Sequence, residues 1–302
     1  MTLKNEFSWS KSRDELFREC PRKYYYAKYG FWGGWEWDAD ERARKLYVLR
    51  NLKSRHMWVG EKLHQEIERI LGDTRSGKKP TIDVSVERVR TIMRREFQDS
   101  KNRLYWKNPK RFPGLYEHEY EVDLSDEKWR GLFEGARECV INFIESEEFA
   151  MIRSVQVDKW LPIEEFLSMD VDRIKVFVKI DFAYRFNNLL RVVDWKTGES
   201  KDADSTVQMR CYCLFAKEKW HEDERHVESR EVNIRTGETR TNRIESKAEL
   251  DWISHYIKNS ANVMLDLLDD RDRNVARMEK FQRTKDENNC KWCNFRKVCE
   301  SE

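Results

Sequence analysis

The chain is poor in the residues that loosen a fold, with only five prolines and eleven glycines among 302 residues. This scarcity leaves little room for long linkers, and no internal repeat or low-complexity stretch is present. No apolar run approaches the roughly 18 residues of a membrane-spanning helix. The first residues are polar, which argues against a secretory signal peptide. We therefore expect a soluble, cytoplasmic protein with no membrane partner.

An excess of charge of one sign is also missing. Lys and Arg number 58 and Asp and Glu number 56, for a net charge of +2. No global field attracts an anionic polymer, so any such surface must be local. Aromatic residues make up 13% of the chain, which argues against disorder and supplies a packed core. No phosphate-loop motif is visible, so the chain has no ATP-driven motor of its own.

Apolar spacing predicts helices on both sides of a central group of strands. Helices are expected over Ser12–Tyr26, Val59–Leu71, Val84–Phe97, Trp129–Ile144, Thr206–Lys217 and Leu250–Asp269. Strands are expected over Tyr116–Val122, Gln156–Glu165, Lys175–Phe186, Leu189–Trp195, Val227–Ile234 and Glu238–Ile244. The pattern predicts a mixed α/β core.

Two of these strands meet at Asn187-Asn188, a pair that tolerates positive φ and suits a two-residue hairpin turn. Such a turn fixes the register, so that Asp181 falls opposite Asp194. Like charges placed directly across a strand pair are destabilising. A divalent cation such as Mg²⁺ or Mn²⁺ would offset that repulsion, since both prefer carboxylate ligands. Two alternatives stay open: Lys179 and Lys196 could neutralise the acids, or a bulge could spoil the register.

Polar residues on two predicted helices favour a site around this hairpin. Gln208 and Tyr212 are four residues apart, so they share a helix face and could reach a phosphate or nucleotide. Upstream, His64 lies beside the apolar stripe of the Val59–Leu71 helix. A lone histidine in such a place is either a metal ligand or a satisfied core residue.

Three of the seven cysteines are close together near the C-terminus: Cys290, Cys293 and Cys299. Three such thiols call for a fourth ligand, and the remaining cysteines are Cys20, Cys139, Cys211 and Cys213. From spacing alone, Zn²⁺, an iron–sulfur cluster and unliganded thiols all remain open.

Taken together, the motifs resemble the PD-(D/E)XK nuclease superfamily, in particular its RecB-like branch. The resemblance rests on G-x-x-x-H (Gly60 to His64), I-D (Ile180-Asp181), D-x-K-T-G (Asp194 to Gly198) and Q-x-x-x-Y (Gln208 to Tyr212), in that order. The superfamily's first acid often follows a proline, whereas Ile180 precedes Asp181 here, as is normal for this branch. The resemblance implies a restriction-endonuclease-like fold, with a mixed central sheet flanked by helices.

The same resemblance implies roles for the motif residues. His64, Asp181, Asp194 and the backbone carbonyl of Trp195 would ligate one or two Mg²⁺ or Mn²⁺ ions. Lys196 would orient or activate the attacking water and stabilise negative charge on the phosphate. Gln208 and Tyr212 would position the substrate.

The cysteines resemble those of iron–sulfur members of this branch, such as the CRISPR-associated RecB-like exonucleases and the nuclease domain of AddB. That resemblance implies a [4Fe–4S] cluster held by Cys20, Cys290, Cys293 and Cys299, with Zn²⁺ as the alternative. The cluster would tie an N-terminal helical segment (1–58) and a C-terminal lobe (246–302) together beside a nuclease core (59–245). Cys139, Cys211 and Cys213 would be packing residues.

Basic segments with interleaved aromatic rings suit single-stranded DNA. The strongest candidate spans 101–111 and offers Lys101, Arg103, Tyr105, Trp106, Lys107, Lys110 and Arg111. Segments 31–37 and 41–57 are further candidates, and a solvated or packing role is the alternative for all three. The function expected is a DNA exonuclease acting on single-stranded ends in repair, recombination, or phage- or CRISPR-related processing, with a helicase or a CRISPR or phage protein as partner. The alternative is a non-catalytic nucleic-acid-binding subunit of a helicase-nuclease or adaptation complex.

Overall fold

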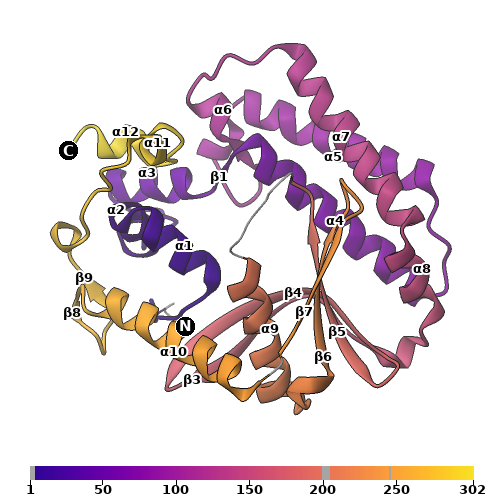
Figure 1. Cartoon of the computed structure of the whole chain (residues 1–302). Helices are drawn as coiled ribbons and strands as arrows, with labels where there is room; N and C mark the ends of the chain where they lie inside the picture. The colour runs from indigo at the N-terminus through magenta and orange to yellow at the C-terminus, as the bar shows by residue number, and fades with distance from the viewer. Residues whose placement is uncertain (1–3, 199–204, 245) are drawn as a thin grey trace.

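A five-stranded mixed sheet forms the centre of the protein in a computed structural model that describes residues 4–198, 205–244 and 246–302 (Figure 1). In spatial order its strands are β3 (Trp160–Val171), β4 (Ile174–Phe186), β5 (Leu189–Lys196), β6 (Val227–Asn233) and β7 (Thr239–Arg243). Neighbouring strands are antiparallel except β5 and β6, which run parallel. A parallel pair needs a crossover connection, and helix α9 (Ser205–Trp220) lies within it.

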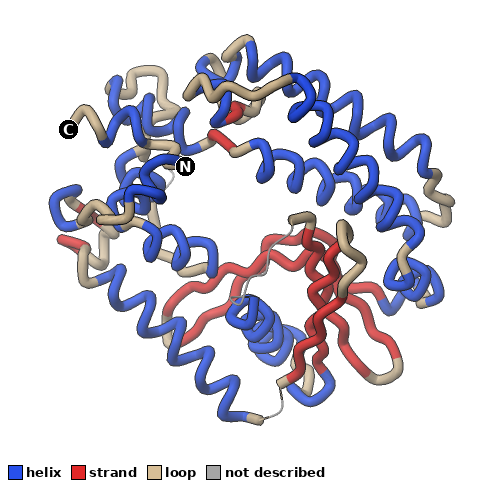
Figure 2. The backbone as a smooth tube through the Cα atoms, turned by 45° about the horizontal axis from the view of Figure 1, so that its top comes forward, coloured by secondary structure: helices blue, strands red, loops and turns tan. Residues whose placement is uncertain are grey.

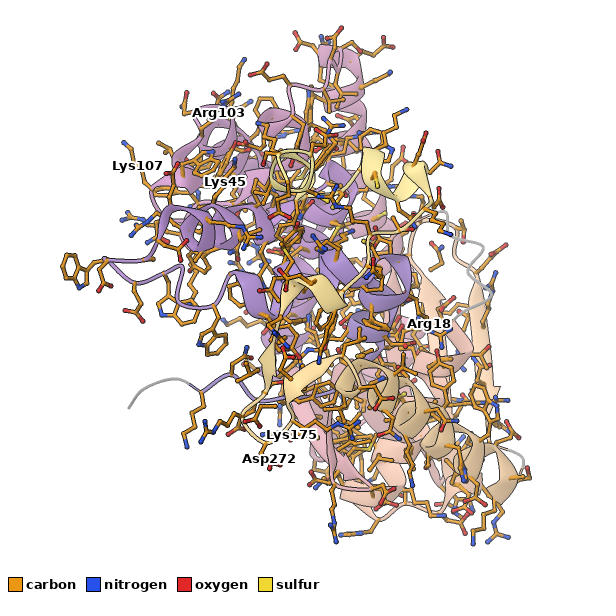
Figure 3. All side chains as sticks on the ribbon, turned by 90° about the vertical axis from the view of Figure 1, so that its left-hand side faces the viewer. Arg18, Lys45, Arg103, Lys107, Lys175 and Asp272 are labelled. Atoms are coloured by element: carbon orange, nitrogen blue, oxygen red, sulfur yellow. The ribbon has the colours of Figure 1, made fainter. Side chains whose placement is uncertain are left out.

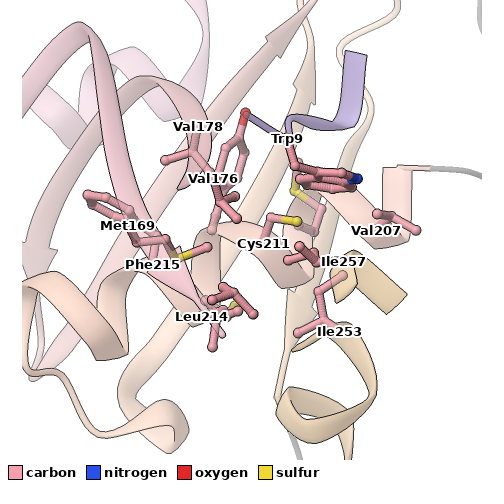
Figure 4. Close-up of a cluster of buried hydrophobic side chains, with 14 of the residues drawn as sticks. Trp9, Met169, Val176, Val178, Val207, Cys211, Leu214, Phe215, Ile253 and Ile257 are labelled. Carbon is pink, nitrogen blue, oxygen red and sulfur yellow. The ribbon is translucent and has the colours of Figure 1, made fainter. Parts of the chain in front are cut away.

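Helices cover both faces of this sheet (Figure 2). One face packs against α4 (Arg55–Arg75), α5 (Ile82–Lys101), α7 (Asp126–Glu145) and α8 (Glu147–Ser154). The other packs against α9 and α10 (Lys247–Leu265), in a core that also holds Trp9, Val176 and Cys211 (Figure 4). The mixed α/β prediction is confirmed. Among the described residues, no helix is long and apolar enough to cross a membrane.

The two ends of the chain form a lobe beside the sheet (Figure 1). Its N-terminal part holds α1 (Lys11–Glu19), α2 (Pro21–Tyr25), a π-helical turn (Tyr26–Gly30) and α3 (Glu41–Arg50). Its C-terminal part holds α11 (Glu287–Lys291) and α12 (Arg296–Cys299). Tyr26 connects the two parts, because its ring lies 5.4 Å from that of Phe295 and its hydroxyl donates to Glu302 at 2.6 Å.

Short elements complete the architecture. These are β1 (Leu52–Lys53) paired with β2 (Gly114–Leu115), β8 (Leu268–Asp270) paired with β9 (Val275–Ala276), the helix α6 (Tyr116–Glu119), and 3₁₀ turns at Leu104–Trp106, Val157–Lys159, Glu224–His226 and Met278–Lys280.

The predicted hairpin turn is confirmed, but the predicted register holds only for the part of the ladder next to the turn. Asn187 and Asn188 have φ of 48° and 60°, the left-handed values that a two-residue hairpin turn of this kind requires. The ladder then runs from Phe186 opposite Leu189 to Phe182 opposite Val193. It ends there, one step before the predicted pairing of Asp181 with Asp194. The local turn chemistry therefore fixes the pairing up to the edge of the acidic pair.

Beyond this point the sheet divides. Val178 and Ile180 contribute to the core beside α9, whereas Phe182 and Tyr184 contribute to the core beside α4 and α7. A regular strand keeps even-numbered residues on one face, so the alternation is broken at Asp181. On the far side of the break, Trp9 pairs with β4: its N–H donates to the carbonyl of Lys175 and its carbonyl accepts from the N–H of Phe177, both at 2.8 Å.

Two local predictions need correction. The helix expected over Ser12–Tyr26 is divided at Cys20, which is extended because residues before proline avoid the helical region. The strand expected over Tyr116–Val122 is wrong, since the segment begins with the helix α6. The alternation of charged and apolar residues in this segment does not indicate a solvent-exposed face. Glu117 and Glu119 are both buried, and they form ion pairs with Arg55 and Lys297, respectively.

The hairpin turn gives a stability prediction. Asn188→Val places a β-branched side chain in the left-handed region, so the free energy of unfolding should fall by about 1–2 kcal/mol. Asn242→Val is the matched control, because Asn242 lies in strand β7, where a β-branched residue fits. Urea denaturation followed by circular dichroism measures both variants. Equal stability of the two would contradict the turn assignment.

Candidate active site

Asp181 lies where β4 separates from β5, and its side chain replaces the missing ladder partner. Oδ2 accepts the backbone N–H of Trp195 at 2.9 Å, and Oδ1 lies 3.4 Å from Nδ1 of His64. The residue is only 4% exposed. A single carboxylate thus connects β4, β5 and α4 at the point of division.

His64 reaches the site because α4 approaches the end of β5 closely. A Cβ on Gly60 would lie 3.1 Å from Oγ1 of Thr197, tighter than most such contacts. Gly60 and His64 are one helical turn apart and share a face. The glycine therefore admits the strand end, and the histidine lies over Asp181. The G-x-x-x-H spacing has a direct steric basis here.

Asp194 and Lys196 lie on the same face of β5, as predicted. Nζ of Lys196 is 2.8 Å from Oδ2 of Asp194 and 3.3 Å from Oε1 of Gln208. The amide of Gln208 donates to Oδ1 of Asp194 at 2.9 Å. Gln208 therefore contacts the acid and the lysine together and fixes their mutual geometry. The sequence predicted that Gln208 would position the substrate, whereas these contacts are all to groups of the protein itself.

Tyr212 connects three elements through one hydroxyl. The oxygen lies 2.9 Å from the carbonyl of Lys179 and from Oδ1 of Asp194, and it accepts from Nε2 of Gln208 at 2.6 Å. Burial and the nearby Asp194 carboxylate raise the pKa of Tyr212 well above its ordinary value. The phenol stays protonated and donates, so it holds β4, β5 and α9 in place.

The electrostatics of Lys196 keep its ammonium charged. Burial lowers the pKa of Lys196, but Asp194, Glu231 and Asp181 outweigh burial and leave that pKa above its ordinary value. A charged lysine at this position cannot accept a proton near neutral pH, but it can stabilise negative charge on a bound group.

Glu231 is a third acid of this site that sequence reasoning missed. On β6 it is the direct partner of Asp194 in the parallel ladder, and it is only 8% exposed. Arg240 lies 3.8 Å from one of its oxygens, while Oε2 is buried and has no hydrogen-bond partner among the described residues. The parallel pairing crosses a helix, so no local pattern could have placed Glu231 beside Asp194.

A cavity of about 470 Å³ opens beside these residues. Lys179, Lys196, Gln208 and Tyr212 line it on the sheet and α9 side. The opposite wall comes from the N-terminal segment, with Trp9, Ser10, Lys11, Ser12 and Glu15. That segment was predicted as part of a separate helical region, and its place at the site follows from the pairing of Trp9 with β4.

The donor set suits a divalent cation in its chemistry. Oδ2 of Asp194 is buried and lacks an aligned hydrogen bond, so its contact with Lys196 is an ion pair only. Carboxylate oxygens and an imidazole are ligands that Mg²⁺ or Mn²⁺ accept. Within the described residues, however, no three His, Cys, Asp or Glu side chains are spaced to hold a metal as they stand. The acids point instead to His64 and Lys196.

The four cysteines predicted as cluster ligands all belong to the terminal lobe. Burial raises the pKa of Cys293 to about 11, and the thiols of Cys20 and Cys299 add to that rise. The sulfur of Cys20 accepts the backbone N–H of Lys23 at 3.5 Å and of Thr284 at 3.4 Å. The thiols are thus electrostatic neighbours, although their spacing does not form a ready metal site. Cys139, Cys211 and Cys213 are buried.

The predicted DNA-binding segment 101–111 is only partly available. Tyr105 is fully buried and its hydroxyl donates to Glu119 at 2.8 Å, so its ring cannot stack on a base. Trp106 is 39% exposed, with its indole N–H donating to the same carboxylate at 2.9 Å. Arg103 pairs with Glu121. Lys101, Lys107, Lys110 and Arg111 are exposed and remain candidates.

Two of three comparisons with known proteins found a match. The sequence profile of the PD-(D/E)XK nuclease superfamily matches residues 8–300. A crystal structure of a candidate exonuclease from Eubacterium rectale is 14% identical, covers 63% of this chain and 74% of its own, and has a TM-score of 0.32. No match was found among curated proteins. Because the profile spans nearly the whole chain, the protein belongs to the PD-(D/E)XK nuclease superfamily.

Proposed function

We propose that this nuclease is a metal-dependent exonuclease that hydrolyses phosphodiester bonds at single-stranded DNA ends. The observation that carries the proposal is the grouping of Asp181, Asp194 and Lys196 where β4 separates from β5. The adjoining cavity is walled by α1, β4 and α9. Such a site suits a flexible strand better than a duplex, which resists bending.

The residues divide the chemistry among them. Asp181, Asp194, His64 and the carbonyl of Trp195 would hold Mg²⁺ or Mn²⁺, which supplies Lewis acidity and lowers the pKa of its bound water. The charged ammonium of Lys196 stabilises the negative charge that develops on the phosphoryl group. Gln208 and Tyr212 keep Asp194 and Lys196 at a fixed separation, and this preorganisation is what makes their charges effective.

The first test removes the lysine. Lys196→Ala should lower the rate of cleavage by about 100- to 1,000-fold, because one preorganised charge on the phosphoryl group is lost. Binding of single-stranded DNA should persist. The rate is measured with Mg²⁺ or Mn²⁺ on end-labelled linear and on circular single strands, and an exonuclease spares the circle. Lys217→Ala is the control. Lys217 pairs with Glu224 on the surface, so this variant should cleave DNA at the wild-type rate.

Two results would overturn this proposal. Full activity of Lys196→Ala would remove the assigned chemistry. A wild-type protein that binds the oligonucleotide but cuts neither substrate with either metal would instead identify a non-catalytic binding subunit. Cleavage of the circular strand would be consistent with nuclease activity but would contradict the assignment as an exonuclease.

A second prediction tests Glu231 as a positioning residue for Lys196. Glu231→Gln should lower kcat by about 10- to 100-fold with little change in KM, because the ammonium loses the attraction of a nearby negative charge. Thermal stability should not fall, since the substitution removes a carboxylate that lies beside Asp194. Glu224→Gln is the surface control. A lower melting temperature with unchanged kcat would show a structural role only.

We also propose that a [4Fe–4S] cluster joins the two ends of the chain through Cys20, Cys290, Cys293 and Cys299. Cys20 and Cys299 influence the pKa of both Cys290 and Cys293, and backbone amides donate to the Cys20 sulfur; both observations support the proposal. Such a cluster would stabilise the lobe, since metal binding couples to folding.

Anaerobic purification tests the cluster. The protein should be brown and contain iron, and Cys299→Ser should lose the iron and melt at a lower temperature. Cys139→Ala should keep its iron, because that thiol lies in the core between the sheet and α7. A colourless protein that contains stoichiometric zinc would contradict the iron–sulfur cluster and identify a zinc site instead.

A further inference from the structure

Two stacked phenylalanines line the cavity of about 470 Å³ beside Lys196, which we name the catalytic cavity. The rings of Phe166 and Phe177 are 4.6 Å apart and nearly parallel, and both residues line the cavity that holds Lys196. Phe166 is 65% exposed, an unusual position for a large apolar ring on a sheet. An exposed ring beside a phosphodiester-cleaving site is a platform on which a nucleobase can stack.

Cations lie around the inner ring of this pair. The guanidinium of Arg13 is 5.7 Å and the ammonium of Lys175 is 5.3 Å from the centre of Phe177. Lys175 lies on the face turned to the viewer in Figure 3. Arg13 is held in place because it donates to the carbonyl of Ser8 at 2.7 Å. Two aromatic rings and two cations therefore lie together beside the cavity.

Arg50 on α3 adds a further cation in the terminal lobe. Arg50 lies 4.1 Å from the centre of the Phe31 ring and donates to the carbonyl of Ala27 at 2.9 Å. It also lines a second cavity of about 630 Å³, which shares Ser12 and Glu15 with the catalytic cavity. The two cavities therefore adjoin along α1.

Arg13, Lys28 and Arg50 form a cluster without a countercharge. Burial lowers the pKa of Lys28 to about 7, and its charged neighbours are Arg13 on α1 and Arg50 on α3. None of the three pairs with a carboxylate in the described part of the chain. Acids and bases nearly balance over the whole chain, so the cluster is not a consequence of composition. Adjacent unpaired cations destabilise a fold unless an anion joins them.

We propose that Phe166, Phe177, Arg13, Lys28 and Arg50 form a track for the single-stranded substrate. Backbone phosphates lie on the three cations, and a base stacks on the exposed ring of Phe166. The track rests on the proposed function, because it gives the cleaved strand its path to Lys196. It lies apart in sequence from the 101–111 segment, so matched variants can separate the two surfaces.

Equilibrium binding tests the track without cleavage. A labelled single strand of about 12 nucleotides is titrated by fluorescence anisotropy in EDTA at several salt concentrations. Lys28→Gln should weaken binding about fivefold and make the salt slope shallower by about 0.7, the value for one lost phosphate contact on a single strand. Phe166→Ala should weaken binding by fivefold or more with the slope unchanged, because stacking releases no counterions. Lys217→Gln is the control, because Lys217 pairs with Glu224 on the surface, and it should bind within about twofold of wild type. The double variant Lys107→Gln/Lys110→Gln tests the competing 101–111 segment and should lose less affinity than Lys28→Gln.

Two further readouts separate binding from folding. Lys28→Gln should not melt at a lower temperature, because it removes an unpaired cation. Wild-type affinity should fall as the pH rises from 6 to 8, because Lys28 loses its proton near pH 7 and a phosphate favours the charged form. Lys28→Gln should lack that part of the pH dependence.

The results distinguish the track from the nuclease activity. Wild-type affinity in Lys28→Gln and Phe166→Ala, or a larger loss in the 101–111 double variant, would overturn the track. Equally strong competition by polyglutamate would also overturn it, because it would show a surface for acidic proteins. A wild-type protein that binds DNA through these residues yet cleaves nothing would uphold the track and reject the proposed exonuclease.

Discussion

The separation of β4 from β5 at Asp181 is the constraint on which the site depends. Two antiparallel strands that stayed paired would place Asp181 and Asp194 face to face with no space between them. Instead the ladder stops at Phe182, and the carboxylate of Asp181 accepts the N–H of Trp195. The opened edge of β4 is taken by Trp9. A cavity then exists where a continuous sheet would have left none.

This arrangement buries several carboxylates within a small space, and charge balance explains which groups surround them. Asp194 and Glu231 are neighbours across β5 and β6, a pairing that is unfavourable for like charges. Lys196 offsets it from one side and Arg240 from the other. The lysine is therefore a structural counterion, and in the proposed mechanism it is also the group that meets a phosphate. A substitution there changes both, which is why the surface lysine control matters.

The sequence predicted what local chemistry determines. The Asn-Asn turn defines the register of its own hairpin, and helical spacing located α4, α5, α7, α9 and α10, so the motif residues fell near one another. Nonlocal pairings were out of reach: Glu231 meets Asp194 across a helical crossover, and Trp9 pairs with a strand far along the chain. The alternation in Tyr116–Val122 misled because Glu117 and Glu119 are buried with partners, which a pattern of polar letters cannot reveal.

The N-terminal segment connects the cavity beside β4 with the terminal lobe, which the sequence analysis treated as separate features. Trp9 pairs with β4 at the cavity, and eleven positions later Cys20 lies in the terminal lobe with Cys290, Cys293 and Cys299. Arg13 lies between them with Lys28 and Arg50, unneutralised. A cation cluster that served only folding would be expected to carry an acid, as Arg55 and Lys297 do with Glu117 and Glu119. Because no acid pairs with these cations among the described residues, we propose that the balancing negative charge comes from the phosphates of a bound strand.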